Sequence, residues 1–245
     1  MPVADTRQRS VSWSVVPYGA RGIYRVGRYL IIGLETAPAD IAHSQLICEW
    51  ATCLAEVCRY EDISLRAHLA DGLTTGGLPT LALAALQGEL FLPQTERHWA
   101  PLAELLSTGP EYLRAATMVR LSIHNDACGS AFVVAPAVRG IATTLQAVAA
   151  SVRLDPEHRL VRAVGLALLP RCGSIVFTAL AETVLRGQAV TVAAIAQAAQ
   201  AVQAQTQEML GPGMPSSAFP VPVTAHLVRK ALDRAAARAL AMVAA

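Results

Sequence analysis

The chain has 245 residues, of which 53% are hydrophobic and 16% charged, and its formal net charge at pH 7 is +2. So apolar a composition excludes disorder over most of the length, and the length allows one large domain or two small ones with a buried core. A net charge near zero, without a cluster of basic residues, argues against a nucleic-acid or membrane-surface partner.

The first 125 residues predict an antiparallel sheet flanked by helices. Residues 24–34 place Gly27 between two β-rich runs, which indicates a hairpin. Residues 38–59 have the spacing of a helix, which starts at the Ala-Pro-Ala-Asp run of residues 37–40. The sequence then predicts a buried helix at 78–86, short strands at 89–92 and 98–99, and a half-buried strand at 117–124.

A second unit begins near Asp126, and its pattern predicts a small strand layer covered by three helices. Residues 147–154 and 160–169 are strand-like and are joined by the turn Asp-Pro-Glu-His. Helical patterns follow at 175–186, 191–210 and 223–243, the first two ended by Gly187 and Gly211, with Thr224 a candidate N-cap of the third. The fold class expected for the whole chain is α+β.

The chain lacks the marks of a secreted or membrane protein. No apolar core follows the basic N-terminal residues, so no signal peptide is predicted, and the most apolar run, 164–169, is far shorter than the roughly 20 residues of a membrane-spanning helix. We therefore expect a cytoplasmic protein with reduced thiols.

The sequence predicts no metal site. Cys48, Cys53 and Cys58 recur every five residues of the first predicted helix, so their thiols point to different faces. We interpret them as small buried hydrophobic residues. The six histidines are dispersed, without the spacing of a metal motif.

Three stretches together resemble the flavin-binding medium subunit of the molybdenum hydroxylases, the family of carbon monoxide and xanthine dehydrogenase flavoproteins. Residues 20–66 follow the family's run "rGI…LRIGA.TT" and its closing "IGDpQIRN", with Gly33 and Arg66 on the family's glycine and arginine. Residues 78–123 are similar to its "LPpaLlALdAeve" segment. Residues 147–239 resemble its C-terminal domain, including the "aE.lLrG" helix.

What carries this resemblance is the order and spacing of the three stretches rather than any single motif. It implies two domains, residues 12–125 as the second subdomain of a FAD-binding domain and residues 126–245 as the C-terminal domain. It also implies FAD as cofactor, with molybdopterin and iron–sulfur subunits as partners.

This sequence departs from the family where the flavin binds. The family begins with a subdomain whose "GG(T/S)(D/H)L" loop holds the FAD diphosphate, and no such loop precedes Gly33 here. Val133 and Ala142 stand where the family has a lysine and an aspartate. A diphosphate needs several convergent backbone N–H groups, and each lost charge-assisted hydrogen bond costs about 1.5–3 kcal/mol. We therefore expect that FAD is not bound in the family manner.

Thr74, Thr75, Gly76 and Gly77 look like the family's second phosphate loop, "GTIGG". An alignment on the Leu-Pro pair that follows places them downstream of that loop, which is then deleted. An alternative alignment equates them with the loop directly, and in that case these four residues, with Gly33 and Arg66, would bind FAD.

His68 and Asp71 lie three residues apart beside this segment, where they would share a helix face. They are the candidate catalytic acid/base pair, and surface polar residues are the alternative interpretation. Trp13, Trp50 and Trp99 are interpreted as core or interface anchors rather than as a stacking platform.

Two functions remain open. In the first, the vacated flavin cleft is reused to bind or transform a small molecule, as in a cyclase or isomerase of secondary metabolism. In the second, the chain is a medium subunit of a molybdenum hydroxylase, an oxidoreductase complex, and serves in electron transfer or as a scaffold.

Overall fold

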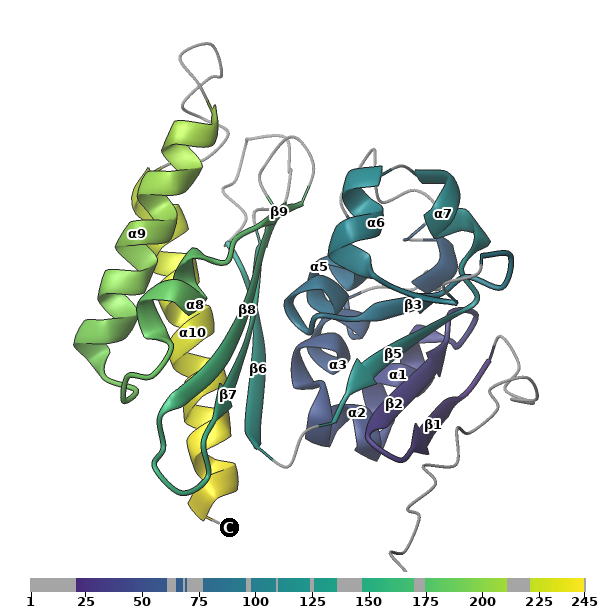
Figure 1. The fold of residues 1–245 in the computed structure, drawn as a ribbon, viewed down its shortest axis with the longest axis horizontal. Coiled ribbons are helices and arrows are strands. Elements are labelled where there is room, and N and C mark those ends of the chain that lie inside the picture. The colour runs from purple at the N-terminus through teal and green to yellow at the C-terminus, as the bar shows by residue number, and fades with distance from the viewer. Residues whose placement is uncertain are drawn as a thin grey trace, which may run out of the picture.

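The computed structural model describes residues 21–60, 65–67, 69, 77–95, 98–108, 110–123, 126–135, 147–169, 175–210 and 221–244. They form two antiparallel sheets with helices between them and further helices on the outer side of the second sheet (Figure 1). Sheet A has the strand order β1-β2-β5-β3-β4, and sheet B has the order β6-β7-β8-β9. The α+β prediction is confirmed. Residues 21–123 are called the N-terminal half below, and residues 126–244 the C-terminal half.

Sheet A contains the strands that the hydrophobic pattern predicts. Its bounds are β1 (Ile23–Val26), β2 (Tyr29–Gly33), β3 (Glu89–Phe91), β4 (Trp99–Pro101) and β5 (Met118–Ser122). The hairpin turns at Gly27, whose φ of +57° suits a glycine. Alternate residues such as Leu30 and Val119 face the buried core, so Tyr29 and Arg120 lie on the opposite face of the sheet.

The helices of the N-terminal half are short. They are α1 (Pro38–His43), α2 (Gln45–Trp50), α3 (Thr52–Cys58), α5 (Leu78–Ala85), α6 (Leu102–Thr108) and α7 (Pro110–Ala115). The single helix predicted for residues 38–59 is wrong, because Ser44 (ψ 123°) and Ala51 (φ −140°) leave the helical region. Each piece buries its own apolar residues, Ile41, Ile47 and Leu54, so tertiary packing overrides helix propensity here.

The C-terminal half consists of β6 (Ala127–Val134), β7 (Ala147–Leu154), β8 (Val161–Leu169), β9 (Val176–Phe177), α8 (Leu180–Leu185), α9 (Val192–Leu210) and α10 (Val221–Ala244). The predicted turn between β7 and β8 is confirmed. Asp155 Oδ1 accepts the backbone N–H groups of Glu157 (2.9 Å) and His158 (3.0 Å). These bonds and the Arg162 guanidinium hold the pKa of Asp155 well below its usual range.

The helix predicted over residues 175–186 is wrong at its start. Val176 and Phe177 instead form the edge strand β9, paired with Leu168 and Ala167, and the helix begins only at Leu180. β-branched and aromatic residues favour such pairing. The helix ends as predicted before Gly187, whose φ is +76°.

Helices pack closely on both faces of sheet B. A Cβ atom on Gly129 would lie 2.0 Å from the carbonyl oxygen of Ala235 in α10, and one on Gly165 would lie 1.9 Å from that of Ala85 in α5. Alanines such as Ala231 and Ala235 in α10 are fully buried, as close helix packing requires. No helix in the described ranges is both long and apolar enough to span a membrane.

The two halves are joined by a hydrogen-bonded ion pair. Glu56 in α3 accepts the backbone N–H of Phe132 in β6 (2.9 Å) and pairs with Arg238 in α10. The Arg238 guanidinium also donates to the carbonyl oxygen of Ser130 (2.5 Å). One cluster thus connects α3, sheet B and the last helix.

Of the three clustered cysteines, Cys53 and Cys58 are buried as predicted, whereas Cys48 is exposed. Burial raises the pKa of the Cys53 thiol to about 12. Cys48 lies in α2, before the helix break at Ala51, whereas Cys53 and Cys58 lie in α3, after the break, and face the core.

Candidate functional site

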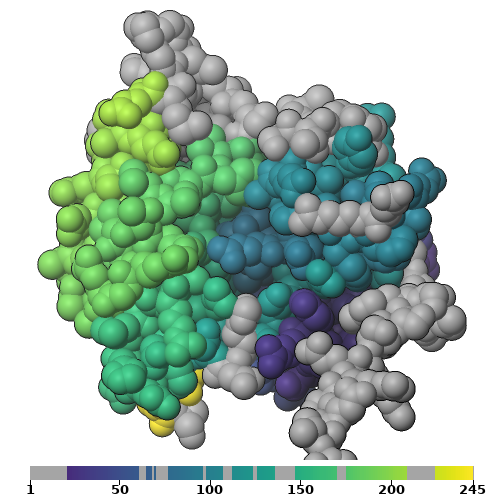
Figure 2. All heavy atoms as spheres, in the orientation of Figure 1, coloured from purple at the N-terminus to yellow at the C-terminus, as the bar shows by residue number. Residues whose placement is uncertain are grey.

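A cavity of about 450 Å³ lies between the two sheets, and we call it the central cleft. Its walls are the inner face of sheet B and the end of sheet A around Ser122, and its floor is formed by α2 and the C-terminal end of α5. Figure 2 shows the line along which the two halves meet, with sheet B and its helices to the left and the N-terminal half to the right.

The sheet B wall carries small and polar side chains that alternate along the strands. Cys128 pairs with Arg153 and Ser130 with Ser151, so all four point to the same face. Two of them hold the halves together. Ser130 Oγ accepts the backbone N–H of Cys53 (3.1 Å), and Ser151 Oγ donates to the carbonyl oxygen of Ala85 (2.5 Å).

Arg153 differs from the other polar residues of this wall, because its side chain is not bonded to another described part of the fold. Its side chain is half-buried, and it forms no hydrogen bond or ion pair with any residue that the structure describes. Its neighbour Cys128 has a pKa raised to about 11 by burial, with the Arg153 charge acting in the opposite direction. The thiol is therefore protonated near neutral pH.

The sheet A wall presents a rigid arginine. The Arg120 guanidinium lies between two aromatic rings, 4.6 Å from the ring centroid of Tyr29 and 4.5 Å from that of Trp99. Its Nε donates to Glu89 Oε2 at 2.6 Å, and its side chain is 16% exposed. Stacking and pairing fix the orientation of this guanidinium.

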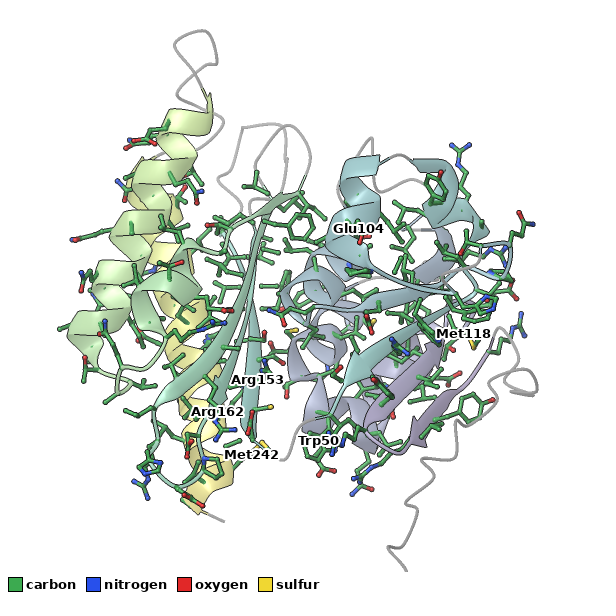
Figure 3. The ribbon with its side chains drawn as sticks, viewed as in Figure 1. Trp50, Glu104, Met118, Arg153, Arg162 and Met242 are labelled. Carbon is green, nitrogen blue, oxygen red and sulfur yellow. The ribbon has the colours of Figure 1, made fainter. Side chains whose placement is uncertain are left out.

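The floor contributes Trp50 and Gln87. Trp50 Nε1 is buried and has no hydrogen-bond partner among the described residues. Gln87 follows the C-terminus of α5 with φ +55°, and its N–H donates to the carbonyl oxygen of Ala84 (2.9 Å). Glycine is the usual residue in that conformation. Figure 3 shows Arg153 on sheet B and Trp50 on the facing helix.

These groups suit the central cleft for binding a ligand. Among its described lining residues are two arginines and one carboxylate, Glu89, which is already paired with Arg120. Unpaired positive charge in a partly desolvated site attracts anions. No histidine lines the described part of the cleft, and its one carboxylate is engaged, so these residues offer no acid/base pair.

The predicted site residues lie elsewhere or outside the described residues. His68, Asp71, Thr74, Thr75 and Gly76 belong to the latter group. The structure therefore does not test the catalytic pair or most of the Thr-Thr-Gly-Gly segment.

The described members of the flavin-site prediction are engaged in the N-terminal half. Gly33 ends β2 and donates its N–H to Gly22 (2.9 Å), while Arg66 Nη1 pairs with Glu35 (2.6 Å). Gly77 precedes α5 in an extended conformation (φ −60°, ψ 140°). None of the three lines the central cleft.

A second hollow of about 460 Å³ lies next to Gly33. It is lined by Gly22, Thr36, Arg21 and the carboxylates of Glu35 and Asp40, among other residues. The Thr36 hydroxyl donates to the carbonyl oxygen of Gly33 (2.6 Å) and accepts the N–H of Gly22 (2.8 Å). Its charged lining residues are two acids and one base.

Sequence reasoning missed the polar residues of the central cleft. Arg120 and Arg153 are ordinary strand residues in the sequence, and only long-range pairing brings them to one cavity. Gln87-Gly88 after an apolar helix indicates a helix end but not a ligand site. Trp50, interpreted as an anchor, lines the cleft and is stacked under Arg25 at 5.9 Å.

Comparison with known proteins gives no match to a protein-family model and none to a curated protein sequence. Solved structures do match. A chain of carbon monoxide dehydrogenase from Hydrogenophaga pseudoflava, in a form lacking the Mo-pyranopterin moiety of the molybdenum cofactor, superposes with a TM-score of 0.70 at 20% identity, over 89% of this chain and 79% of that one.

Two further enzymes have chains of this fold. Reconstituted carbon monoxide dehydrogenase from Oligotropha carboxidovorans gives a TM-score of 0.66 at 19% identity, and quinoline 2-oxidoreductase from Pseudomonas putida 86 gives 0.64 at 14% identity. Each match covers 89% of this chain and 79% of the other. The likeness confirms the fold that the resemblance to the flavin-binding medium subunits predicts.

Proposed function

We propose that this chain binds a small molecule in the central cleft and does not bind FAD in the manner of the flavin-binding subunits whose fold it shares. The observation that carries the proposal is Arg153, a half-buried cation without a partner among the described residues, in a 450 Å³ cavity between the two halves. Cavities of about 300–1,000 Å³ between structural units are common ligand sites.

The energetics of Arg153 favour a ligand. A charge taken partly out of water is disfavoured unless it is paired, and buried polar groups in proteins nearly always have partners. A bound molecule with a negatively charged acceptor group would satisfy the Arg153 guanidinium.

The proposal against FAD rests on the hydrogen bonds around Gly33. The N–H of Gly33 and the hydroxyl of Thr36 are engaged within the N-terminal half, so they are not available to a diphosphate, and the charge of Arg66 is paired with Glu35. Purified protein carrying a flavin spectrum at near-stoichiometric occupancy would contradict this part of the proposal.

A ligand screen tests the cleft directly. Ser122 is exposed and lines the cleft, so Ser122→Trp fills part of the cavity without disturbing the core. Val192→Trp, on an exposed position of α9, is the matched control. We expect that ligands detected by NMR bind the native chain and the Val192→Trp control but not Ser122→Trp. Hits that bind all three equally would overturn the proposal.

If the bound molecule is also transformed, as by a cyclase or isomerase, His68 and Asp71 are the proposed acid/base pair. Replacing them as His68→Gln and Asp71→Asn should then abolish turnover, since each change removes the group that accepts or donates the proton. Full turnover in both variants would remove them from the mechanism.

A second candidate function follows from the fold likeness to chains of carbon monoxide dehydrogenase and quinoline 2-oxidoreductase. In it, the chain is a medium subunit of a molybdenum hydroxylase, with a molybdopterin subunit and an iron–sulfur subunit as partners. Affinity purification from the native host distinguishes the two. Stoichiometric co-purification of two such subunits would favour the complex, and isolation of the chain alone would favour the cleft-binding function.

A further inference from the structure

We infer that the ligand of the central cleft is a small aromatic carboxylate, held through its carboxylate by Arg153 and Arg120 and through its ring by the aromatic side chains of the cleft. This inference rests on the proposed cleft binding and adds the chemical class of the ligand. It follows from three properties of the described lining residues: charge, donor geometry and aromatic surface.

The charge of the cleft selects an anion. Arg153 projects from sheet B and Arg120 from sheet A, so positive groups come from both walls. Glu89 is the one acid among the described lining residues, and it is bonded to Arg120 Nε. One positive charge therefore remains uncompensated, and a ligand with a single negative charge neutralises it.

The donors have the geometry that suits a carboxylate. Glu89 and the two stacked rings fix the Arg120 plane through Nε, and the structure gives its terminal amino groups no further partner among the described residues. A guanidinium offers paired parallel N–H donors that match the two oxygens of a carboxylate. Holding the side chain rigid lowers the entropy cost of that contact.

Phosphate is disfavoured by the same lining. Phosphate sites are commonly built from clustered backbone N–H groups at helix N-termini or in glycine-rich loops. The described lining of the central cleft includes the residues that follow α5 and strand residues from both sheets. Its one helix start is Pro101, which has no N–H, and the N–H of the next residue, Leu102, donates to the carbonyl oxygen of Gly88. The negative end of the α5 dipole near Leu86 and Gln87 works against a multiply charged anion.

The aromatic and apolar side chains of the cleft suit the ring of the proposed ligand. Trp50, Tyr29, Leu86 and Pro101 line the cleft together with the polar groups. Flat rings pack well against such side chains.

The test compares benzoate with neutral benzamide, which has nearly the same shape, by ligand-detected NMR titration of the full chain. We expect benzoate to bind at least tenfold more tightly than benzamide. Arg153→Gln should weaken benzoate binding by about 10- to 100-fold, which corresponds to the loss of a charge-assisted hydrogen bond, and should remove the preference over benzamide. Arg153→Lys should restore only part of it, because lysine lacks the paired donors.

Arg229→Gln is the matched control, since it removes the same charge from an exposed position of α10. Its benzoate affinity should equal that of the native chain. Inorganic phosphate serves as the competing anion and should not displace benzoate at equal concentration. Thermal unfolding of each variant checks that the fold is kept.

The outcomes separate this inference from the proposed function. Equal binding of benzoate and benzamide, or an unchanged affinity in Arg153→Gln, would overturn the carboxylate assignment. Displacement of benzoate by phosphate would likewise overturn it. If neither probe binds while other ligands still lose binding in Ser122→Trp, the ligand class is wrong and the cleft function stands.

Discussion

Replacing Gly165 by alanine tests how sheet B and α5 fit together at the edge of the central cleft. An added Cβ would lie 1.9 Å from the carbonyl oxygen of Ala85 and 2.7 Å from Ser151 Oγ. Non-bonded atoms prefer about 3.5 Å or more. The carbonyl belongs to the backbone and cannot rotate away, so the end of α5 must retreat from the sheet by more than about 1 Å.

The cost follows from two contributions. Overpacking of a tight interface costs about 1–3 kcal/mol. The retreat also breaks the hydrogen bond from Ser151 Oγ to Ala85, which contributes about 0.5–1.5 kcal/mol. We expect a loss of about 2–4 kcal/mol in the free energy of unfolding, a large part of the 5–15 kcal/mol typical of a domain.

Urea unfolding measures this loss, and Gly129→Ala is the matched comparison. A Cβ on Gly129 would lie 2.0 Å from the Ala235 carbonyl oxygen on the opposite face of the sheet. Both variants should lose stability to a similar extent. Gly165→Ala should weaken binding in the central cleft more, because it displaces Leu86 and Gln87 on the cleft floor, whereas an added Cβ on the lining residue Gly129 points to α10. A Gly165→Ala chain within 0.5 kcal/mol of native stability (roughly the error of such measurements) would refute the reasoning.

Three further predictions concern other parts of the structure. Gln87→Gly should raise the free energy of unfolding by up to about 1 kcal/mol, because glycine adopts the left-handed conformation without strain, and this gain exceeds the entropy that glycine adds to the unfolded chain. The same change should weaken ligand binding, because it removes a side chain that lines the cleft. A loss of stability in urea unfolding would contradict the prediction. Glu56→Gln and Arg238→Met should each lower the free energy of unfolding by about 1.5–3 kcal/mol. A double-mutant cycle should give a coupling energy above about 1 kcal/mol. Additive losses would show that the two side chains do not stabilise each other. Burial raises the pKa of the Cys53 thiol from about 9 in the unfolded chain to about 12 in the fold. The contribution of Cys53 to the free energy of unfolding should therefore be constant below pH 9 and fall by about 1.4 kcal/mol per pH unit above it. Cys53→Ala should not show this fall.

Local signals allowed much of the fold to be predicted. The hairpin at Gly27, the buried helix before Leu86 and the turn at Asp155 depend on neighbouring residues, and the structure has all three. The errors lie where distant contacts decide. Ser44 and Ala51 break a helix so that its pieces can wrap around the core, and Val176 pairs with Leu168 instead of starting a helix.

The central cleft could not be predicted in the same way. Arg120 and Arg153 belong to strands of different sheets, and only packing of the two halves brings them to one cavity. The resemblance to flavin-binding subunits directed attention to Gly33 and the segment around Gly77 instead, because motif reasoning finds positions that a known family uses. A site built on other positions of the same fold has no motif.

The inner face of sheet B is apolar at one end and polar at the other. At one end, Phe132, Ala149 and Leu169 belong to the hydrophobic core that α3 and α5 complete. Toward the other end, Ser151 fixes α5, and the same face then continues to Arg153, which forms no hydrogen bond or ion pair with a described residue. Substitutions at the apolar end, or at Ser151, would loosen the contact between the two halves, whereas a substitution of Arg153 should change only the cleft. If the ligand binds at Arg153 as we propose, its contacts lie away from the apolar end on which stability depends, so the cleft can acquire a new ligand class while the fold is retained.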